Sequence, residues 1–178
     1  EAYELLTLAQ GAGGGIDWLS YGRTAIAPSN QDSYPHSEDV LIGMIRVAVD
    51  HFATTAPAQL EVIAARHQQS DRALFRRLAL YALSKCDPTA ADALLDRAVF
   101  RGWARDHWIR PEFYLLMSSH YAHASEEARM RFVAALRDDA WWGPEFDEHA
   151  GHARYSLSQK LHREAPGSEI TATFAAEE

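Results

Sequence analysis

Apolar residues recur at helical spacing along most of the chain, and they are densest between residues 71 and 86. Within that segment they fill two adjacent rows, with Leu74, Leu78 and Tyr81 in one and Phe75, Ala79, Ala82 and Cys86 in the other. Leu80 and Leu83 add apolar side chains on the opposite side. Because a helix that is apolar nearly all round must be covered on both flanks, we predict that residues 71–86 form an internal helix, capped by Ser70.

The same spacing predicts further helices before and after this one. Their expected starts lie near residues 38, 57, 71, 89, 111, 126 and 144, where a capping residue or a first-turn proline often stands. Starts two helices apart are separated by roughly 32 to 40 residues, which is the range of helix-pair repeats. The alternating pattern of a strand does not occur, and residues 168–178 have no clear period. We therefore predict an all-α fold, a right-handed stack of antiparallel helix pairs, which is a HEAT-like α-solenoid.

The first 36 residues break this regularity. Residues 1–10 have a helical pattern that ends in four glycines among residues 11–15. This run is not a phosphate-binding loop, because no strand precedes it and no Gly-Lys-Ser/Thr follows it. We expect residues 11–36 to be an irregular loop region within one helical-repeat segment, residues 1–178. Since the chain begins at Glu1 without a methionine, we interpret it as a piece of a longer protein.

Composition restricts the classes of function. A net charge of −8 argues against a general nucleic-acid binder, which needs a positive surface for phosphates. No apolar run approaches the ~20 residues of a membrane span, and no signal peptide is recognisable, so we expect a soluble, cytoplasmic protein without membrane contact. The single cysteine, Cys86, lies on an apolar helix face, which is typical of a buried structural thiol. We expect no cofactor.

Cations and aromatic residues alternate in one segment of the chain: Arg97, Arg101, Trp103, Arg105, Trp108 and Arg110. In a nucleic-acid groove such residues pair with phosphates and stack on bases. The same residue types dominate the hot spots of protein–protein interfaces. A third interpretation is structural, with the tryptophans as core anchors between helix pairs and the arginine stems covering them. We favour the structural interpretation.

Two adjacent arginines, Arg76 and Arg77, fall on the predicted internal helix beside Leu78. An unpaired charge at such a position would be strongly unfavourable, so each arginine requires a carboxylate partner. Acidic residues are plentiful in the chain, and we expect an ion pair between helices. We assign Arg76, Arg77 and Leu78 structural roles.

Histidines stand three residues apart in two places, His120 with His123 and His149 with His152. A helix would place each pair on one face, which is one requirement of a metal site. The His-Glu-x-x-His motif is missing, however, and we favour solvated or capping histidines over metal ligands. No Ser-His-Asp or paired-carboxylate arrangement is recognisable from the spacing, so we do not expect this segment to be an enzyme.

Three segments follow patterns of a known kind of helical region. Residues 20–26, with Gln31 and Asp32 after them, resemble a Trp-Arg-x-Ala-Ile…Gln-Asn/Asp stretch. Residues 75–83 resemble a Phe-Arg-Arg-Leu-Ala-Leu helix, and residues 111–116 resemble a His-Glu-Tyr-Tyr-x-Leu-Leu pattern. All three patterns belong to the helical C-terminal regions of large bacterial STAND-type NTPases, signal-transduction ATPases with numerous domains, many of which are antiphage defence proteins. The resemblance implies a nucleotide-hydrolysing domain N-terminal to this segment, and a sensor role for the segment itself.

These observations lead to one expected function and one alternative. We expect a non-catalytic helical-repeat recognition module of a larger cytoplasmic bacterial protein. It would bind a protein partner, such as a phage component, on the concave face formed by successive helices. The alternative is a HEAT-like nucleic-acid-binding or DNA glycosylase-like protein that uses the cations of residues 97–110.

Overall fold

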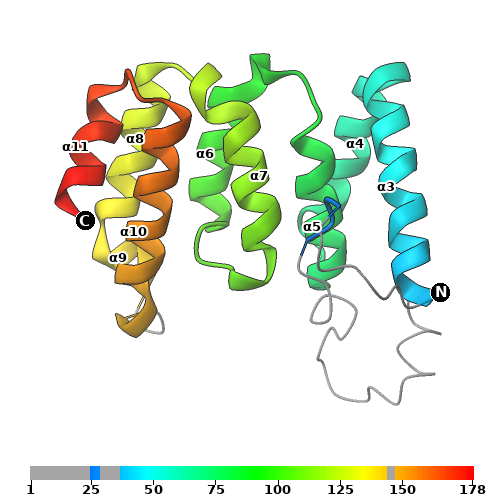
Figure 1. Ribbon diagram of the computed structural model, residues 1–178, viewed down its shortest axis with the longest axis horizontal. Helices are drawn as coiled ribbons and strands as arrows, with labels where there is room; N and C mark the ends of the chain where they lie inside the picture. Colours follow the sequence, from blue (N-terminus) through cyan, green and yellow to red (C-terminus); the bar gives the residue numbers. More distant parts are fainter. Residues whose placement is uncertain (1–24, 29–36, 144–146) are drawn as a thin grey trace.

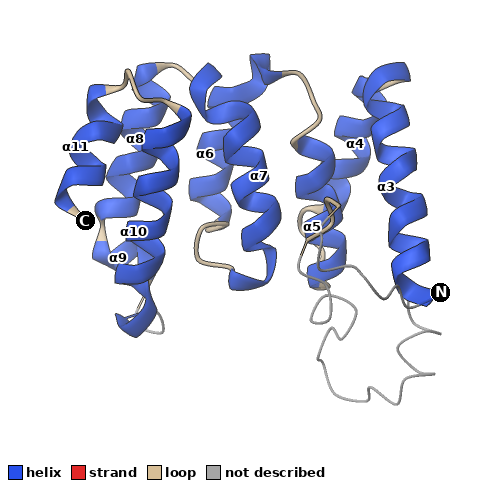
Figure 2. Ribbon diagram, in the orientation of Figure 1, coloured by secondary structure: helices blue, strands red, loops and turns tan. Residues whose placement is uncertain are grey.

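The computed structural model describes residues 25–28, 37–143 and 147–178. Within these residues the secondary structure is entirely helical, with no strand, which confirms the all-α prediction (Figure 2). The nine α-helices are α3 (Ser37–Thr55), α4 (Pro57–His67), α5 (Ala73–Leu83), α6 (Ala91–Arg101), α7 (Arg110–His120), α8 (Glu126–Arg137), α9 (Asp139–Trp142), α10 (Asp147–Glu164) and α11 (Glu169–Glu177). Short 3₁₀ turns precede α6 and α7 and follow α7: η1 (Pro88–Ala90), η2 (His107–Ile109) and η3 (Tyr121–His123).

The helices stand side by side in a row, and successive long helices run in alternating directions (Figure 1). Helix α3 lies at one end of the row and α11 at the other. Helix α5 packs on α7 and α7 packs on α10, whereas α6 packs on α8 and α8 on α11. Helix α4 packs mainly on α5, and α3 contacts both. The described helices therefore form two layers that share one core.

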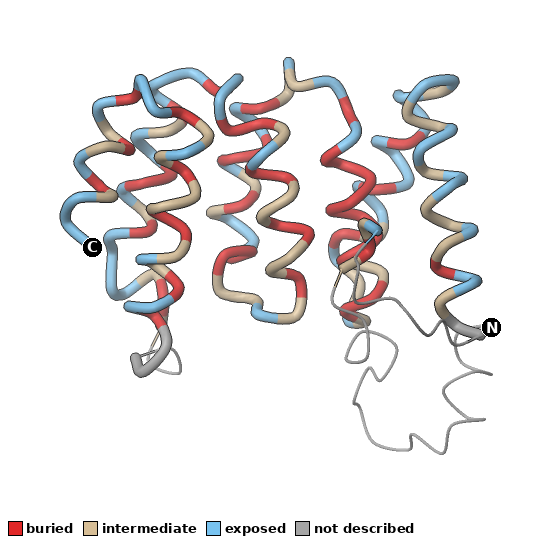
Figure 3. Tube along the Cα trace, in the orientation of Figure 1, coloured by how far each residue is buried: buried red, intermediate tan, exposed pale blue. Residues whose placement is uncertain are grey.

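The core extends along nearly the whole row, on the sides of the helices that face each other (Figure 3). It begins at Leu60 of α4 and ends at Phe174 of α11, with Phe113, Phe132 and Trp142 among its largest buried side chains. A smaller apolar cluster lies between α3 and α5: Ile26, Ile42, Leu74, Leu78 and Tyr81. Burial of these two clusters provides the main favourable term in folding.

Helix α5 is the internal helix that the apolar pattern predicted, and nine of its residues from Ala73 to Leu83 are buried. The predicted bounds and cap were wrong. The helix begins at Ala73, and its N-cap residue is Arg72, whose backbone is extended and which has no side-chain cap. The Ser70 hydroxyl instead accepts a hydrogen bond from the amide of Arg72, at 3.2 Å. This Ser70 turn satisfies an amide before the helix starts, as serine side chains often do.

Several predicted helix starts agree with the structure. Helix α4 begins at Pro57, and α8 follows Ser125, whose hydroxyl accepts a hydrogen bond from the Ala128 amide at 3.2 Å. The start near residue 89 is a 3₁₀ turn, and α6 begins at Ala91. Helix α6 ends at Gly102, which has φ +65°, a left-handed conformation that glycine adopts without strain.

Two helices were not predicted. Residues 168–178 lack a clear apolar period, yet they contain α11, whose amide at Thr171 is capped by Ser168. Only Thr171 and Phe174 of α11 are buried, which is too narrow a face to give a helical signal. Helix α9 has four residues and is equally invisible to periodicity. Of the predicted irregular region, 11–36, only residues 25–28 are described, and residues 1–10 lie outside the described part.

Candidate functional site

The predicted segment of alternating cations and aromatic residues does not form one surface. Helix α6 ends at Arg101, so the four-residue spacing that joined Arg97, Arg101 and Arg105 does not continue along one helix face. Trp103 is buried in the core, and Arg101 is exposed with its guanidinium 5.2 Å from the Phe100 ring centroid. The segment is thus divided among three surroundings, and a continuous nucleic-acid groove is not among them.

Arg97 lines a groove of about 270 Å³ between α4 and α6. Cys86 lies in the same groove together with Glu61. Burial, followed by the charge of Glu61, raises the pKa of the Cys86 thiol to about 11. The thiol is therefore protonated at neutral pH and is a poor nucleophile.

Arg105 and Arg110 come together in a pocket of about 260 Å³, which we call the basic pocket. His107 of η2 and His152 of α10 add two further basic side chains, and Trp142 of α9 forms an apolar wall. The loop after α6 and the start of α7 thus face α9 and α10 across this space. His107 stacks on Trp108, with ring centroids 4.7 Å apart, so Trp108 lies beside the pocket and not in the core.

Arg105 is fixed in the basic pocket by Trp141. Its Nη1 donates a hydrogen bond to the Trp141 carbonyl at 2.6 Å, and its guanidinium lies 4.9 Å from the Trp141 ring centroid. The Trp141 indole N–H in turn donates to the Val99 carbonyl at 3.2 Å. Gly102 leaves room for this arrangement, because a Cβ there would collide with the Arg105 guanidinium.

Arg77 and Glu112 form a buried ion pair between α5 and α7. Their side chains are only 2% and 1% exposed, and Arg77 donates from Nε at 2.8 Å and from Nη2 at 3.2 Å. The Ile26 amide donates to the same carboxylate at 2.7 Å, so we call these three residues the Glu112 node. Arg76 pairs with Asp106 at 2.8 Å. Each arginine therefore has a carboxylate partner on another element, as the sequence analysis expected.

The Glu112 node also brings together one residue from each of three segments of the sequence, residues 20–26, 75–83 and 111–116. Ile26 belongs to the first segment, Arg77 to the second and Glu112 to the third. The sequence analysis did not identify Glu112, although it is the acidic residue of the third pattern. Its position 35 residues from Arg77 carries no periodic signal of a contact.

The two histidines of the first predicted pair, His120 and His123, lie in different surroundings. His120 is fully buried, with Nε2 at 2.9 Å from the Leu83 carbonyl, whereas His123 is exposed. Burial lowers the pKa of His120, against an opposing effect of the Leu83 carbonyl. The side chain of His149 lies outside the described residues, and His152 lines the basic pocket. Across the part of the chain that is described, no group of three or more metal-binding side chains is gathered.

A serine, a lysine and a glutamate meet between α7 and α10, a contact that sequence reasoning missed. Lys160 Nζ donates to Ser118 Oγ at 2.6 Å and to Glu164 at 3.0 Å, and Ser118 donates to Glu164 at 2.8 Å. Burial alone would raise the pKa of Glu164, but hydrogen bonds from Lys160 and Ser118 lower it. Lys160 donates a hydrogen bond to Ser118, whereas a general base accepts the proton of the hydroxyl that it activates. The contact connects two helices and does not form a nucleophile.

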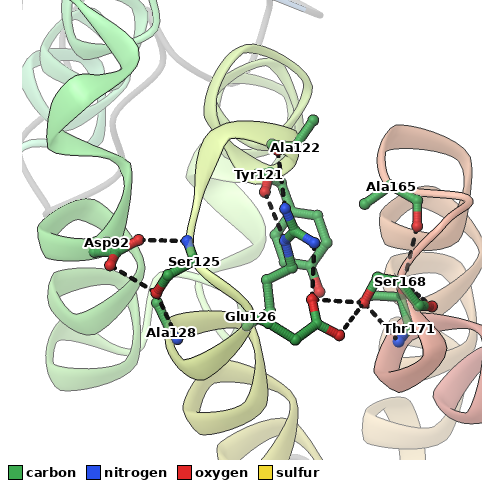
Figure 4. Close-up of polar contacts among 10 residues, drawn as sticks. Asp92, Tyr121, Ala122, Ser125, Glu126, Ala128, Ala165, Ser168 and Thr171 are labelled. Atoms are coloured by element: carbon green, nitrogen blue, oxygen red, sulfur yellow. Dashed lines mark hydrogen bonds and ion pairs between the residues drawn. The ribbon is translucent and has the colours of Figure 1, made fainter.

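Helix caps are connected to one another between α6, α8 and α11 (Figure 4). Asp92 of α6 accepts hydrogen bonds from the amide and the hydroxyl of Ser125, both at 2.7 Å. Glu126, the next residue, accepts from the hydroxyl of Ser168 at 2.9 Å. Arg129 donates to Glu126 at 2.8 Å, and it also donates to two carbonyls of η3. This cap network connects the first turns of α6, α8 and α11.

Helix α3 carries apolar side chains on its outer side as well as its inner side. Val40, Met44 and Val47 are 58%, 66% and 63% exposed, and they lie at i, i+4 and i+7 on one helix face. We call these three residues the α3 stripe. Leu41 is exposed beside it, whereas Ile42 on the inner face is buried. An amphipathic surface helix would carry polar residues on this outer face.

No family model, curated protein or solved structure matches this chain. Among the described helices, none combines the length and the apolarity that crossing a membrane requires.

Proposed function

We propose that this chain is a non-catalytic recognition module that binds a protein partner through the α3 stripe. The observation that carries the proposal is the exposure of Val40, Met44 and Val47 on one face of α3. Single exposed apolar residues are ordinary, but a row of large ones on one helix is typical of an interface. Apolar residues at i, i+4 and i+7 are also the pattern by which helices contact protein partners.

The two-layered row of alternating helices supports a HEAT-like α-solenoid as the architecture of this module. In such arrays each helix pair contacts only its neighbours, and extended surfaces are left for binding. The contacts of α5 with α7 and of α6 with α8 follow this nearest-neighbour order. A right-handed stack of helix pairs is the finer form of the fold that we propose.

We further propose that the module is the sensor of a larger cytoplasmic bacterial protein of the STAND type. The support is the Glu112 node, where one residue from each of the three resembling segments meets. If the three segments form one motif, their shared buried contact is the physical reason for it. Three unrelated sequence matches would have no reason to meet at one contact. The partner would then be a foreign protein, such as a phage component, and the nucleotide-hydrolysing domain would belong to another part of that protein.

The alternative, a nucleic-acid-binding or glycosylase-like protein, finds less support. It would need the cations of residues 97–110 to follow a phosphate backbone together. Arg97 instead lines a groove between α4 and α6, and Arg101 lies over the Phe100 ring, whereas Arg105 and Arg110 line the basic pocket.

The test compares two sets of exposed apolar residues. The chain is used as bait in lysates of phage-infected bacteria, the captured protein is identified, and its affinity for the bait is measured after purification. Met44→Ser with Val47→Ser should weaken binding at least tenfold. Met130→Ser, which changes an equally exposed methionine on α8, should leave the affinity unchanged. Equal affinities for all three chains would refute the α3 stripe as the binding face, and so would concentration-dependent dimerisation through the same residues.

A further inference from the structure

The basic pocket collects positive charge in a chain whose net charge is −8. Four basic side chains line it, Arg105, His107, Arg110 and His152, and they come from the loop after α6, from η2, from α7 and from α10. No described residue that lines the pocket is acidic. Such a concentration of one charge sign raises the local concentration of anions.

Two acidic residues with described side chains that lie close in sequence to the pocket, Asp106 and Asp139, are engaged elsewhere. Asp106, which precedes His107, pairs with Arg76 at 2.8 Å and caps η2 through the Trp108 amide. Asp139 of α9 pairs with Arg154 at 2.9 Å. These carboxylates therefore do not neutralise the pocket arginines, although each lies close to them along the chain.

Arg110 has no hydrogen bond and no ion pair with any described residue, although it is partly buried. Six other arginines behave differently, because each has a carboxylate partner: Arg76, Arg77, Arg129, Arg131, Arg137 and Arg154. With respect to the described residues, all five N–H donors of this partly buried guanidinium are unused. It is the group in the pocket that most needs an anion.

Arg105 is oriented before any ligand arrives. Its contacts with the carbonyl and the ring of Trp141 hold the guanidinium, and its other donors remain available. A fixed guanidinium loses less side-chain entropy on binding than a free one does. The pocket thus combines the fixed guanidinium of Arg105 with that of Arg110, which has no polar partner among the described residues. Trp142 adds an apolar wall.

We propose that the basic pocket binds a phosphoryl group. Arg105 and Arg110 supply two positive charges, which match a phosphate dianion, and planar guanidinium groups bind phosphate oxygens with two parallel hydrogen bonds. His107 and His152 supply further ring N–H donors at the rim. The pocket of about 260 Å³ admits one such group with part of the molecule that carries it. A nucleic-acid strand would require a track of such cations.

The experiment is calorimetric titration of the intact chain, at low ionic strength, with inorganic phosphate and with O-phosphoserine. Arg110→Gln should weaken the binding of both probes at least tenfold, and His152→Gln should weaken it less. Arg101→Gln removes a cation outside the pocket, over the Phe100 ring, and should leave the affinity unchanged. Since Arg110 has no polar partner among the described residues, Arg110→Gln should not lower the melting temperature.

The two probes distinguish the source of the phosphoryl group. Tighter binding of phosphoserine indicates a phosphorylated molecule, and equal affinities indicate free phosphate. Either result supports the pocket. The proposal fails if neither probe binds below 10 mM, an order-of-magnitude limit of about 2.7 kcal/mol of binding free energy. It fails also if Arg101→Gln and Arg110→Gln weaken binding equally, or if acetate binds as tightly as phosphate. The α3 stripe lies on other helices, so its test and this one succeed or fail independently.

Discussion

The two ends of the described helical row differ in the apolar side chains that they expose and in how their helices are capped. At the α3–α4 end, Val40, Met44 and Val47 face solvent, and neither α4 nor α5 has a side-chain N-cap. At the α8–α11 end, serines cap both α8 and α11, and the cap network joins these helices to α6. A stacked array needs a polar outer layer wherever it meets water. The difference teaches that the two ends are not equivalent, and it is the difference that the proposed binding through the α3 stripe requires.

Packing beneath the two ends differs as well. A cavity of about 190 Å³ with an almost wholly apolar lining lies between α3, α4 and α5. Helix α3 is tied to α5 by a hydrogen bond from the Tyr81 hydroxyl to Asp50, at 2.8 Å. At the other end Arg137 forms an ion pair with Glu177 of α11 and lies over the Phe174 ring. The α3–α4 end is packed more loosely and is held to the rest of the row through α5. Substitutions in that connection, and then at each end, test this comparison.

Glu112→Ala should have the largest effect, because the Glu112 node connects α5, and with it the α3–α4 end, to α7. The substitution removes the carboxylate that pairs with the buried, charged Arg77, and it removes the acceptor of the Ile26 amide. We expect the free energy of unfolding to fall by about 3–5 kcal/mol. Urea denaturation measures this loss. Glu127→Ala, which breaks an exposed ion pair with Arg131, is the control and should change stability by less than about 0.5 kcal/mol.

Leu78→Ala tests the packing beneath α3. Leu78 is buried and lines the apolar cavity, so truncation enlarges a space that already exists. We expect a loss of about 2–5 kcal/mol in the free energy of unfolding. Leu41→Ala on the outer side of α3 removes the same atoms from an exposed position and should lose less than about 1 kcal/mol. Equal losses for the two variants would mean that α5 is not an internal helix.

Acidification should weaken the joint between α5 and α7 through His120. Burial lowers the pKa of this imidazole below its ordinary value of 6.5, so the unfolded chain binds more protons than the folded chain just below that pH. Stability is then fully present above about pH 6.5 and decreases as the pH falls, by at most about 1.4 kcal/mol per unit. Urea denaturation between pH 7.5 and 5.5 measures the slope.

Two variants identify the histidine that causes this slope. His120→Gln retains a donor for the Leu83 carbonyl but does not titrate, so its stability should depend less on pH than that of the original chain. His123→Gln changes the exposed neighbour and should retain the original dependence. The carboxyls with lowered pKa values, Asp87, Asp92 and Glu164, titrate below their ordinary values of 3.8 to 4.5, outside this interval. An unchanged slope in His120→Gln would refute the assignment.

Ser125→Ala tests the capped end of the row. The hydroxyl of Ser125 accepts from the Ala128 amide and donates to Asp92, so alanine breaks the cap and its link to α6. We expect a loss of about 1 kcal/mol, within the ordinary range of about 0.5–2 kcal/mol for N-caps. Thr54→Ala removes an exposed hydroxyl at the end of α3, which donates only to its own helix, and should change stability by less than about 0.5 kcal/mol. If both variants lose equally, the cap network does not distinguish the two ends.

Local signals in the sequence predicted most helices and the internal position of α5. Pro57 and Ser125 mark helix starts by their own backbone chemistry, and a buried helix such as α5 shows apolar rows on all sides. Helices α9 and α11 were not predicted. Helix α9 has four residues and α11 has two buried side chains, and neither is enough to show a helical period in the sequence. The Ser70 hydroxyl accepts a hydrogen bond from the Arg72 amide in the turn before α5. The preference of serine for such positions does not distinguish this turn from a helix N-cap.

The candidate sites were less predictable because they join residues far apart in the sequence. Arg110 and His152 share a pocket, and no spacing rule relates positions on α7 and α10. The interval of four between Arg101 and Arg105 indicated one helix face, but Gly102 ends the helix between them. The requirement that Arg77 have a carboxylate partner was predictable from charge and burial alone. Which carboxylate it is depends on how α5 and α7 pack.

Met44→Ser with Val47→Ser should have the smallest effect on stability, and this double variant tests the α3–α4 end most directly. Both side chains are more than 60% exposed, so serine removes apolar surface that already meets water. We expect the free energy of unfolding to change by less than about 0.5 kcal/mol, although the same variant should lose partner binding. A loss above about 1.5 kcal/mol that grows with protein concentration would mean that a second copy covers the α3 stripe. A small change at every concentration would leave the stripe free for a partner, because apolar side chains that already meet water contribute little to folding.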